Sequence, residues 1–63
     1  MESNMTEKQR IEALCKLVLK MRKLGNIEVS VVIEMDILFP FYGVSYESGK
    51  FLDKGDNEII IKD

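Results

Sequence analysis

The sequence has no histidine and only one cysteine, Cys15, among its 63 residues. A lone cysteine cannot form an internal disulfide, and without histidine the commonest nitrogen ligand for a metal ion is missing. A zinc site built from one thiol and scattered carboxylates would be unusual. The same absences exclude Ser-His and Cys-His catalytic pairs. We therefore predict no catalytic, cofactor-binding or metal-binding residues, and we expect that the protein is not an enzyme.

A long apolar run is also missing. The chain has no stretch of about 20 apolar residues, so the sequence predicts no transmembrane helix. Its polar beginning lacks the basic start and the apolar run of a signal peptide. The single thiol is compatible with a reducing compartment. Together these features favour a cytoplasmic protein.

The small size of the chain limits its stability. A domain this short buries only about 60% of the surface that its unfolded chain exposes. Disulfides, metals or partner chains usually compensate, but here an internal disulfide is impossible and a metal site would be unusual. Because 46% of the residues are hydrophobic, a dense core is possible and disorder is not expected. We predict one domain over residues 1–63, with residues 1–5 flexible, and a homodimer as the favoured state.

The first half of the chain predicts a helix over residues 6–24. Thr6 and Gln9 have the spacing of a capping box, in which each side chain bonds the backbone of the other residue. Apolar residues then recur at helical spacing. Gly25 follows the basic last turn and is a typical residue for ending a helix.

After Gly25 the hydrophobic period changes from that of a helix to that of a strand. Residues 27–36 alternate between an apolar set and a mostly polar set, and β-branched residues are frequent. The apolar set is Ile27, Val29, Val31, Ile33 and Met35. Because alternation with β-branched residues is typical of a half-buried strand, we predict a strand here.

The remainder of the sequence predicts a small meander. Pro40 indicates a bend or a sheet edge, because proline cannot donate to a central ladder. A second strand is expected over 42–47, then a two-residue turn at Ser48 and Gly49, a short strand over 50–52, a turn over 53–57 and a last strand over 58–62. The predicted fold class is α+β, with one N-terminal helix packed on a small antiparallel meander of three to four strands, in the order α-β-β-(β)-β.

The predicted helix is apolar over more of its circumference than one sheet face would cover. Leu17 and Leu24 lie on one flank of it, and Leu19 lies on the other. One interpretation is a second contact surface, for a copy of the chain or for another protein. The other is that a curled sheet and the N-terminal segment cover the flanks. We favour the first, so the predicted function is a small protein-interaction module, adaptor or regulator.

Charge is distributed unevenly along the chain. Residues 1–24 carry six basic and three acidic side chains, and residues 25–63 carry three basic and eight acidic ones, for a formal net charge of −2. A basic front and an acidic back would attract each other within one molecule or between copies.

A nucleic-acid-binding regulator is the alternative function. Lys16, Lys20 and Lys23 fall in one stripe of the predicted helix. Aromatic residues that could stack on bases are Phe39, Phe41, Tyr42, Tyr46 and Phe51. The low pI of about 5.0 opposes this function.

Two further features have structural interpretations. Cys15 is expected to be a core residue. The carboxylates of Glu34 and Asp36 are expected on the solvated face of the strand.

Overall fold

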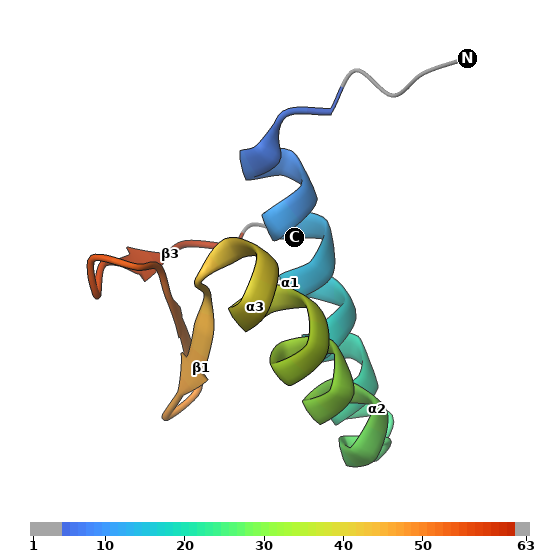
Figure 1. Ribbon diagram of the computed structural model, residues 1–63. Coiled ribbons are helices and arrows are strands. Elements are labelled where there is room, and N and C mark those ends of the chain that lie inside the picture. The colour runs from blue at the N-terminus through green and yellow to red at the C-terminus, as the bar shows by residue number, and fades with distance from the viewer. Residues whose placement is uncertain (1–4, 62–63) are drawn as a thin grey trace.

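The computed structural model describes residues 5–61 of the chain, and the predicted flexibility of residues 1–4 lies outside them. The described residues form an α+β structure, with helices first and a three-stranded antiparallel sheet last (Figure 1). The helical part consists of α1 (Glu7–Lys23), α2 (Ile27–Ile33), the π-helical turn η1 (Glu34–Leu38) and α3 (Phe39–Tyr42). The strands are β1 (Ser45–Glu47), β2 (Lys50–Leu52) and β3 (Glu58–Ile59). The α+β class and the small meander are confirmed.

The predicted N-terminal helix is confirmed as α1, with both of its ends capped as expected. The Thr6 hydroxyl accepts a hydrogen bond from the Gln9 N–H at 3.1 Å, and the Gln9 side chain accepts one from the Thr6 N–H at 2.9 Å. At the other end Gly25 adopts a φ of +84°, where a side chain would be strained. The Gly25 N–H donates to the Arg22 carbonyl and the Asn26 N–H to the Met21 carbonyl, which is the Schellman pattern.

The prediction of a strand over residues 27–36 is wrong, because this segment is helical. Segments α2, η1 and α3 follow one another without a break and form one helix over residues 27–42, called here the second helix (Figure 1). Only Ile33 of the five apolar residues assigned to the buried strand face is buried. The residue at the centre of the real buried face is Ser30, which the alternation had assigned to the solvated face.

Ser30 explains why the helical pattern was hidden. Ile33 and Leu38 are buried along with it, and Ile37 is half-buried, which is the spacing of one helix face. The Ser30 hydroxyl donates to the Ile27 carbonyl at 2.7 Å, so its burial leaves no polar group unsatisfied. Contacts with α1 outweigh the low helix propensity of the β-branched residues.

Pro40 lies inside the second helix, so the predicted bend or sheet edge is also wrong. In a regular α-helix the proline ring collides with the carbonyl four residues earlier, here that of Asp36. The preceding turn is π-helical, and the Phe39 N–H donates to the Glu34 carbonyl five residues back. We attribute the passage of the helix through Pro40 to this wider turn, which displaces the carbonyls from their α-helical positions.

The helix ends at Gly43, and this shortens the strand predicted over 42–47. Gly43 has a φ of +69°, and a methyl group in place of its hydrogen would lie 2.5 Å from Cγ of Lys54. The backbone conformation therefore favours glycine, and any larger residue would also displace the Lys54 side chain. Strand β1 begins two residues later, at Ser45.

The predicted β-hairpin and turn are confirmed. Ser48 and Gly49 have φ values of +51° and +81°, as a type I′ turn requires. Strand β2 is the central strand, with Tyr46 opposite Phe51 on one side and Ile59 opposite Phe51 on the other. Asp53 organises the next turn, because its carboxylate accepts from the N–H groups of Gly55 and Asn57. The last strand ends at Ile59, and position 62 of its predicted range lies outside the described residues.

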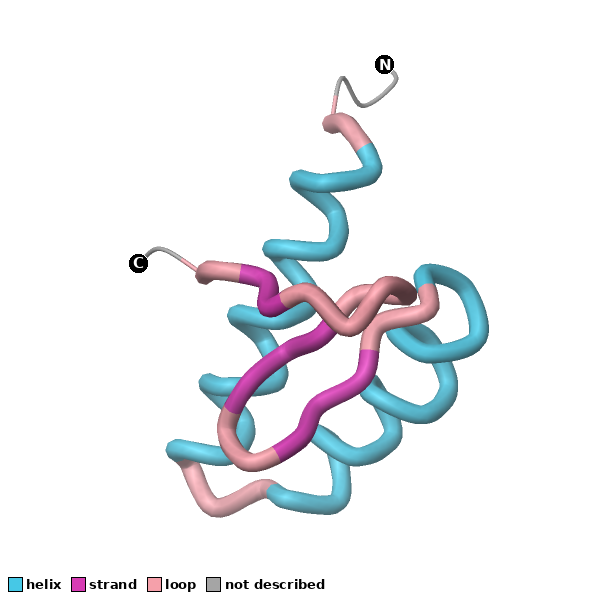
Figure 2. The backbone as a smooth tube through the Cα atoms, turned by 90° about the vertical axis from the view of Figure 1, so that its left-hand side faces the viewer, coloured by secondary structure: helices cyan, strands magenta, loops and turns pink. Residues whose placement is uncertain are grey.

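The sheet lies across one side of the two antiparallel helices (Figures 1 and 2). The core forms where the helices and the sheet meet. Its buried hydrophobic residues are Cys15 and Val18 from α1, Ile33 and Leu38 from the second helix, and Val44 and Phe51 from the sheet region. Within residues 5–61, no element covers the opposite side of the helices in either view.

Candidate functional site

The leucines predicted to form a contact surface are all exposed in the folded chain. The exposed fractions are 42% for Leu17, 36% for Leu19 and 68% for Leu24. The competing interpretation required the sheet to cover these leucines, and the described part of the sheet does not. Exposure by itself does not identify a partner, but it leaves these side chains available for one.

Leu17 and Leu24 lie on the same face of α1, and Leu19 does not. Leu17 and Leu24 are seven residues apart, or about two turns, and Lys20 lies between them on the same side. Leu19 has Lys16 and Lys23 as its neighbours three residues before it and four residues after it. The leucines therefore form one pair and one isolated apolar residue within a basic stripe.

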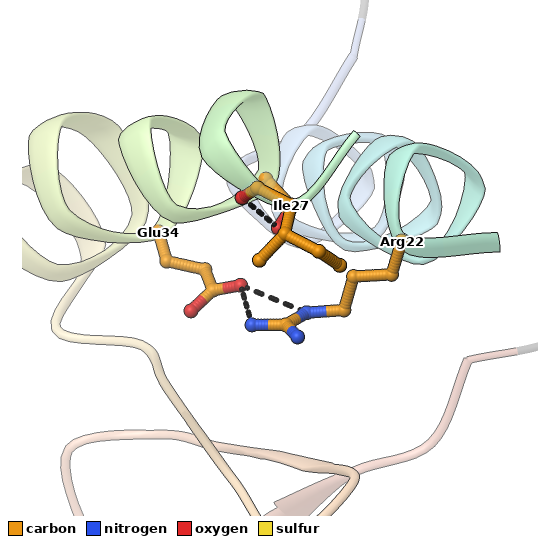
Figure 3. Close-up of polar contacts among 4 residues, drawn as sticks. Arg22, Ile27 and Glu34 are labelled. Atoms are coloured by element: carbon orange, nitrogen blue, oxygen red, sulfur yellow. Dashed lines mark hydrogen bonds and ion pairs between the residues drawn. The ribbon is translucent and has the colours of Figure 1, made fainter. Parts of the chain in front are cut away.

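Arg22 and Glu34 mark the side of each helix that faces the sheet. The Arg22 guanidinium donates to the Glu34 carboxylate from Nη2 at 2.9 Å and from Nε at 3.3 Å (Figure 3). Its central carbon also lies 4.4 Å from the centre of the Tyr46 ring in β1. This cluster joins α1, η1 and β1, and its half-buried position gives it a structural role. The prediction that Glu34 lies on a solvated face is therefore wrong, although Asp36 is exposed.

The opposite side of both helices carries exposed apolar residues. At 100° per residue, Leu17 and Leu24 lie about 140° and 160° around α1 from Arg22. On the second helix, Val29 and Val32 lie about 140° and 160° from Glu34. Val29 is 40% exposed and Val32 is 52% exposed. We call the surface formed by Leu17, Leu24, Val29 and Val32 the outer helix face.

Sequence analysis missed the contribution of the second helix to this face. The strand prediction placed Val29 in the core and Val32 on a polar strand face, so neither was expected to join the leucines of α1. Two local signals indicate a helix start at this point. The Asn26 side chain caps α2 by accepting from the Val29 N–H at 3.3 Å, and Glu28 lies in the first turn.

Cys15 is a core residue, as predicted. Its side chain is completely buried between the helices and the sheet. Burial raises the pKa of the Cys15 thiol to about 11, and the negative charge of Glu12 contributes in the same direction. The thiol is therefore protonated at neutral pH and is not an activated nucleophile.

Two open grooves flank the sheet. A groove of about 850 Å³ lies between the first half of α1 and the segment 53–60, with walls that include Ile11, Tyr42, Asp53 and Lys54. A smaller groove of about 250 Å³ lies between the second helix and β1, beside Met35 and Phe39. Neither groove holds a cluster of metal ligands, since residues 5–61 contain no group of three or more histidine, cysteine, aspartate or glutamate side chains that could bind an ion.

Comparison of the chain with protein-family models, curated proteins and solved structures gives no significant match. The helices of the described region are also too short or too polar to cross a membrane. The exposed surface of the described residues is therefore the basis for a functional proposal.

Proposed function

We propose that the chain is a small, non-enzymatic protein-interaction module that forms a homodimer through the outer helix face. The observation that carries this proposal is the exposure of four apolar side chains on the side of the helices opposite the sheet. Leu24, at 68% exposed, is the largest contributor. Several exposed apolar side chains on one side of a small protein are typical of contact sites.

The helix pair supplies a compact contact area. Helices of 17 and 16 residues are about 25 Å long, and two side by side are roughly 20 Å wide, so their outer side has a footprint of about 500 Å². A standard interface takes about 800 Å² from each partner, so this face corresponds to an interface at the small end of the range. The footprint is about a tenth of the 4838 Å² accessible surface of the chain. Burying this surface would also supply the stability that so short a chain has difficulty in obtaining alone.

Sedimentation equilibrium with charged variants tests the proposal. Wild-type protein should have a mass of twice the 7.3 kDa chain. Leu17→Glu and Leu24→Glu should each raise the Kd of the dimer by roughly 30-fold or more, because a charge would be buried in the contact. Ile60→Glu is the matched control, since Ile60 is 63% exposed but follows β3. A monomeric wild type, or equal weakening by Ile60→Glu, would overturn the proposal.

A nucleic-acid-binding regulator remains the second candidate, on the strength of one observation. Lys16, Lys20 and Lys23 are all exposed along α1, and the one ion pair found within residues 5–61 involves none of them. Fluorescence anisotropy with labelled duplex and single-stranded DNA, repeated over a range of salt concentrations, separates the two candidates. Binding that weakens with salt and depends on these lysines would favour this alternative.

A cytoplasmic location is part of the proposal. It is supported by the free, buried thiol of Cys15, which suits a reducing compartment.

A further inference from the structure

We infer that the homodimer is held by crossed helix pairing, in which α1 of one copy packs against the second helix of the other copy. This inference rests on the proposed function and specifies its partner surface. The occupant of the outer helix face is therefore a second copy of this chain, in a two-fold arrangement that forms the same helix contact twice.

The charges beside the outer helix face differ between the two helices. Lys20 lies between Leu17 and Leu24 on α1, and it is exposed. Asp36 lies four residues after Val32 and seven after Val29, so it borders the apolar pair of the second helix, and it is also exposed. Residues 25–49 contain no lysine or arginine, so the second helix has no positive charge to compensate Asp36.

These charges favour one of the possible helix pairings. Pairing α1 with its own copy would set the helix that carries Lys20 against the same helix, and pairing the second helices would set the helix that carries Asp36 against its own copy. Both arrangements bring like charges together. Crossed pairing sets the helix that carries Lys20 against the helix of the other copy that carries Asp36, and the two-fold axis repeats this contact. Charge complementarity therefore selects the crossed arrangement.

The sizes of the apolar side chains favour the same arrangement. Leucines form the apolar part of the face on α1, and valines form it on the second helix. Crossed pairing places large side chains against small ones at each contact, which allows them to interdigitate. Like-with-like pairing would place leucine against leucine in one contact and leave valine against valine in the other.

Salt dependence of the wild-type dimer is the first test. Opposite charges across an interface attract less at higher ionic strength, whereas like charges repel less. Crossed pairing therefore predicts that the Kd rises when sodium chloride is increased from low to moderate concentration. A Kd that falls over this range would overturn crossed pairing while leaving the proposed dimer intact. A wild type that is monomeric throughout would overturn both.

Charge reversal is the second test. Lys20→Glu and Asp36→Lys should each raise the Kd by roughly tenfold, because each creates two repulsive contacts in a symmetric dimer. The double variant Lys20→Glu/Asp36→Lys should recover most of the wild-type affinity. Far-UV circular dichroism of all three variants controls for loss of the helices. Folded single variants with the wild-type Kd would contradict the inference. So would a double variant in which the affinity losses of the two single variants simply add.

Discussion

Ser30 shows how one small polar residue can occupy the centre of a helix contact. It is fully buried, yet its hydroxyl is satisfied within its own helix by the Ile27 carbonyl. A small side chain at this position allows α1 and the second helix to approach closely. The polarity of Ser30 predicts an exposed residue, whereas the residue is buried. Burial is possible because a short hydroxyl side chain can bond the backbone of its own helix.

Substitutions of Ser30 test this account. Ser30→Ala should change the free energy of unfolding by less than about 1 kcal/mol, because the lost hydrogen bond is offset by the higher helix propensity of alanine. Ser30→Leu should destabilise the fold by about 1–3 kcal/mol, because the position has no free volume for it. Urea unfolding at one fixed protein concentration measures both. A stable Ser30→Leu variant would show that the helices are not closely packed here.

Cys15 predicts a specific loss of stability at alkaline pH. An ordinary thiol has a pKa of 9.0, whereas burial raises that of Cys15 to about 11 in the folded chain. Above pH 9 the unfolded chain loses the thiol proton and the folded chain retains it, so stability falls as the pH rises from 9 to 11. Below pH 9 the thiol is protonated in both states and contributes no pH dependence.

The expected loss is on the order of 2–3 kcal/mol by pH 11. Other groups titrate in this range, so the measurement compares wild type with Cys15→Ala. The difference in unfolding free energy between the two proteins should shift against wild type between pH 9 and 11. Parallel pH profiles would mean that the thiol is accessible to solvent in the folded chain.

At the scale of elements, the cluster of Arg22, Glu34 and Tyr46 fixes how α1, the second helix and β1 fit together. The side chains of Arg22 and Glu34 are only 28% and 14% exposed, so their ion pair is less screened than a surface pair. A double-mutant cycle with Arg22→Leu and Glu34→Gln should give a coupling energy of about 1 kcal/mol. A cycle of Arg22→Leu with Asp36→Asn is the control and should give no coupling. Equal coupling in both cycles would contradict the assignment.

The elements differ in how well the sequence predicts them. Helix α1 is predicted because Thr6, Gln9 and Gly25 give local capping signals that agree with its hydrophobic spacing. The β-hairpin is predicted because Ser48 and Gly49 form a typical two-residue turn sequence, and both adopt the positive φ that such a turn requires. The second helix is not predicted, since its stability comes from contacts with α1 that override the strand-like alternation of its residues.

The outer helix face was predicted only in part for the same reason. Leu17 and Leu24 were identified because α1 was correctly assigned and its apolar circumference was too wide for one sheet, whereas Leu19, assigned to the same surface, lies on another face of the helix. Val29 and Val32 were missed because their exposure depends on a helix that the alternation concealed. A surface that two elements share can be predicted from the sequence only when both elements are assigned correctly.

With the second helix, the whole molecule has two layers, a helix pair and a sheet. The side of the helix pair that faces away from the sheet is uncovered in the described part of the chain. The sheet covers one side of a helix pair, and the described residues place nothing on the other (Figures 1 and 2). The predicted single helix would have been covered by the sheet on one side, with leucines left on its flanks. The observed helix pair presents exposed apolar residues from both helices on this side, and they are the basis of the proposed dimer.

The most direct test of this central claim is an isotope-filtered NOE experiment on a dimer of ¹³C-labelled and unlabelled chains. The account predicts intermolecular NOEs from the methyl groups of Leu17 and Leu24, and crossed pairing assigns their partners to Val29 and Val32. Intermolecular NOEs confined to the sheet side, for example to Ile60, would contradict it. So would the absence of any intermolecular NOE together with a solution mass of a single chain.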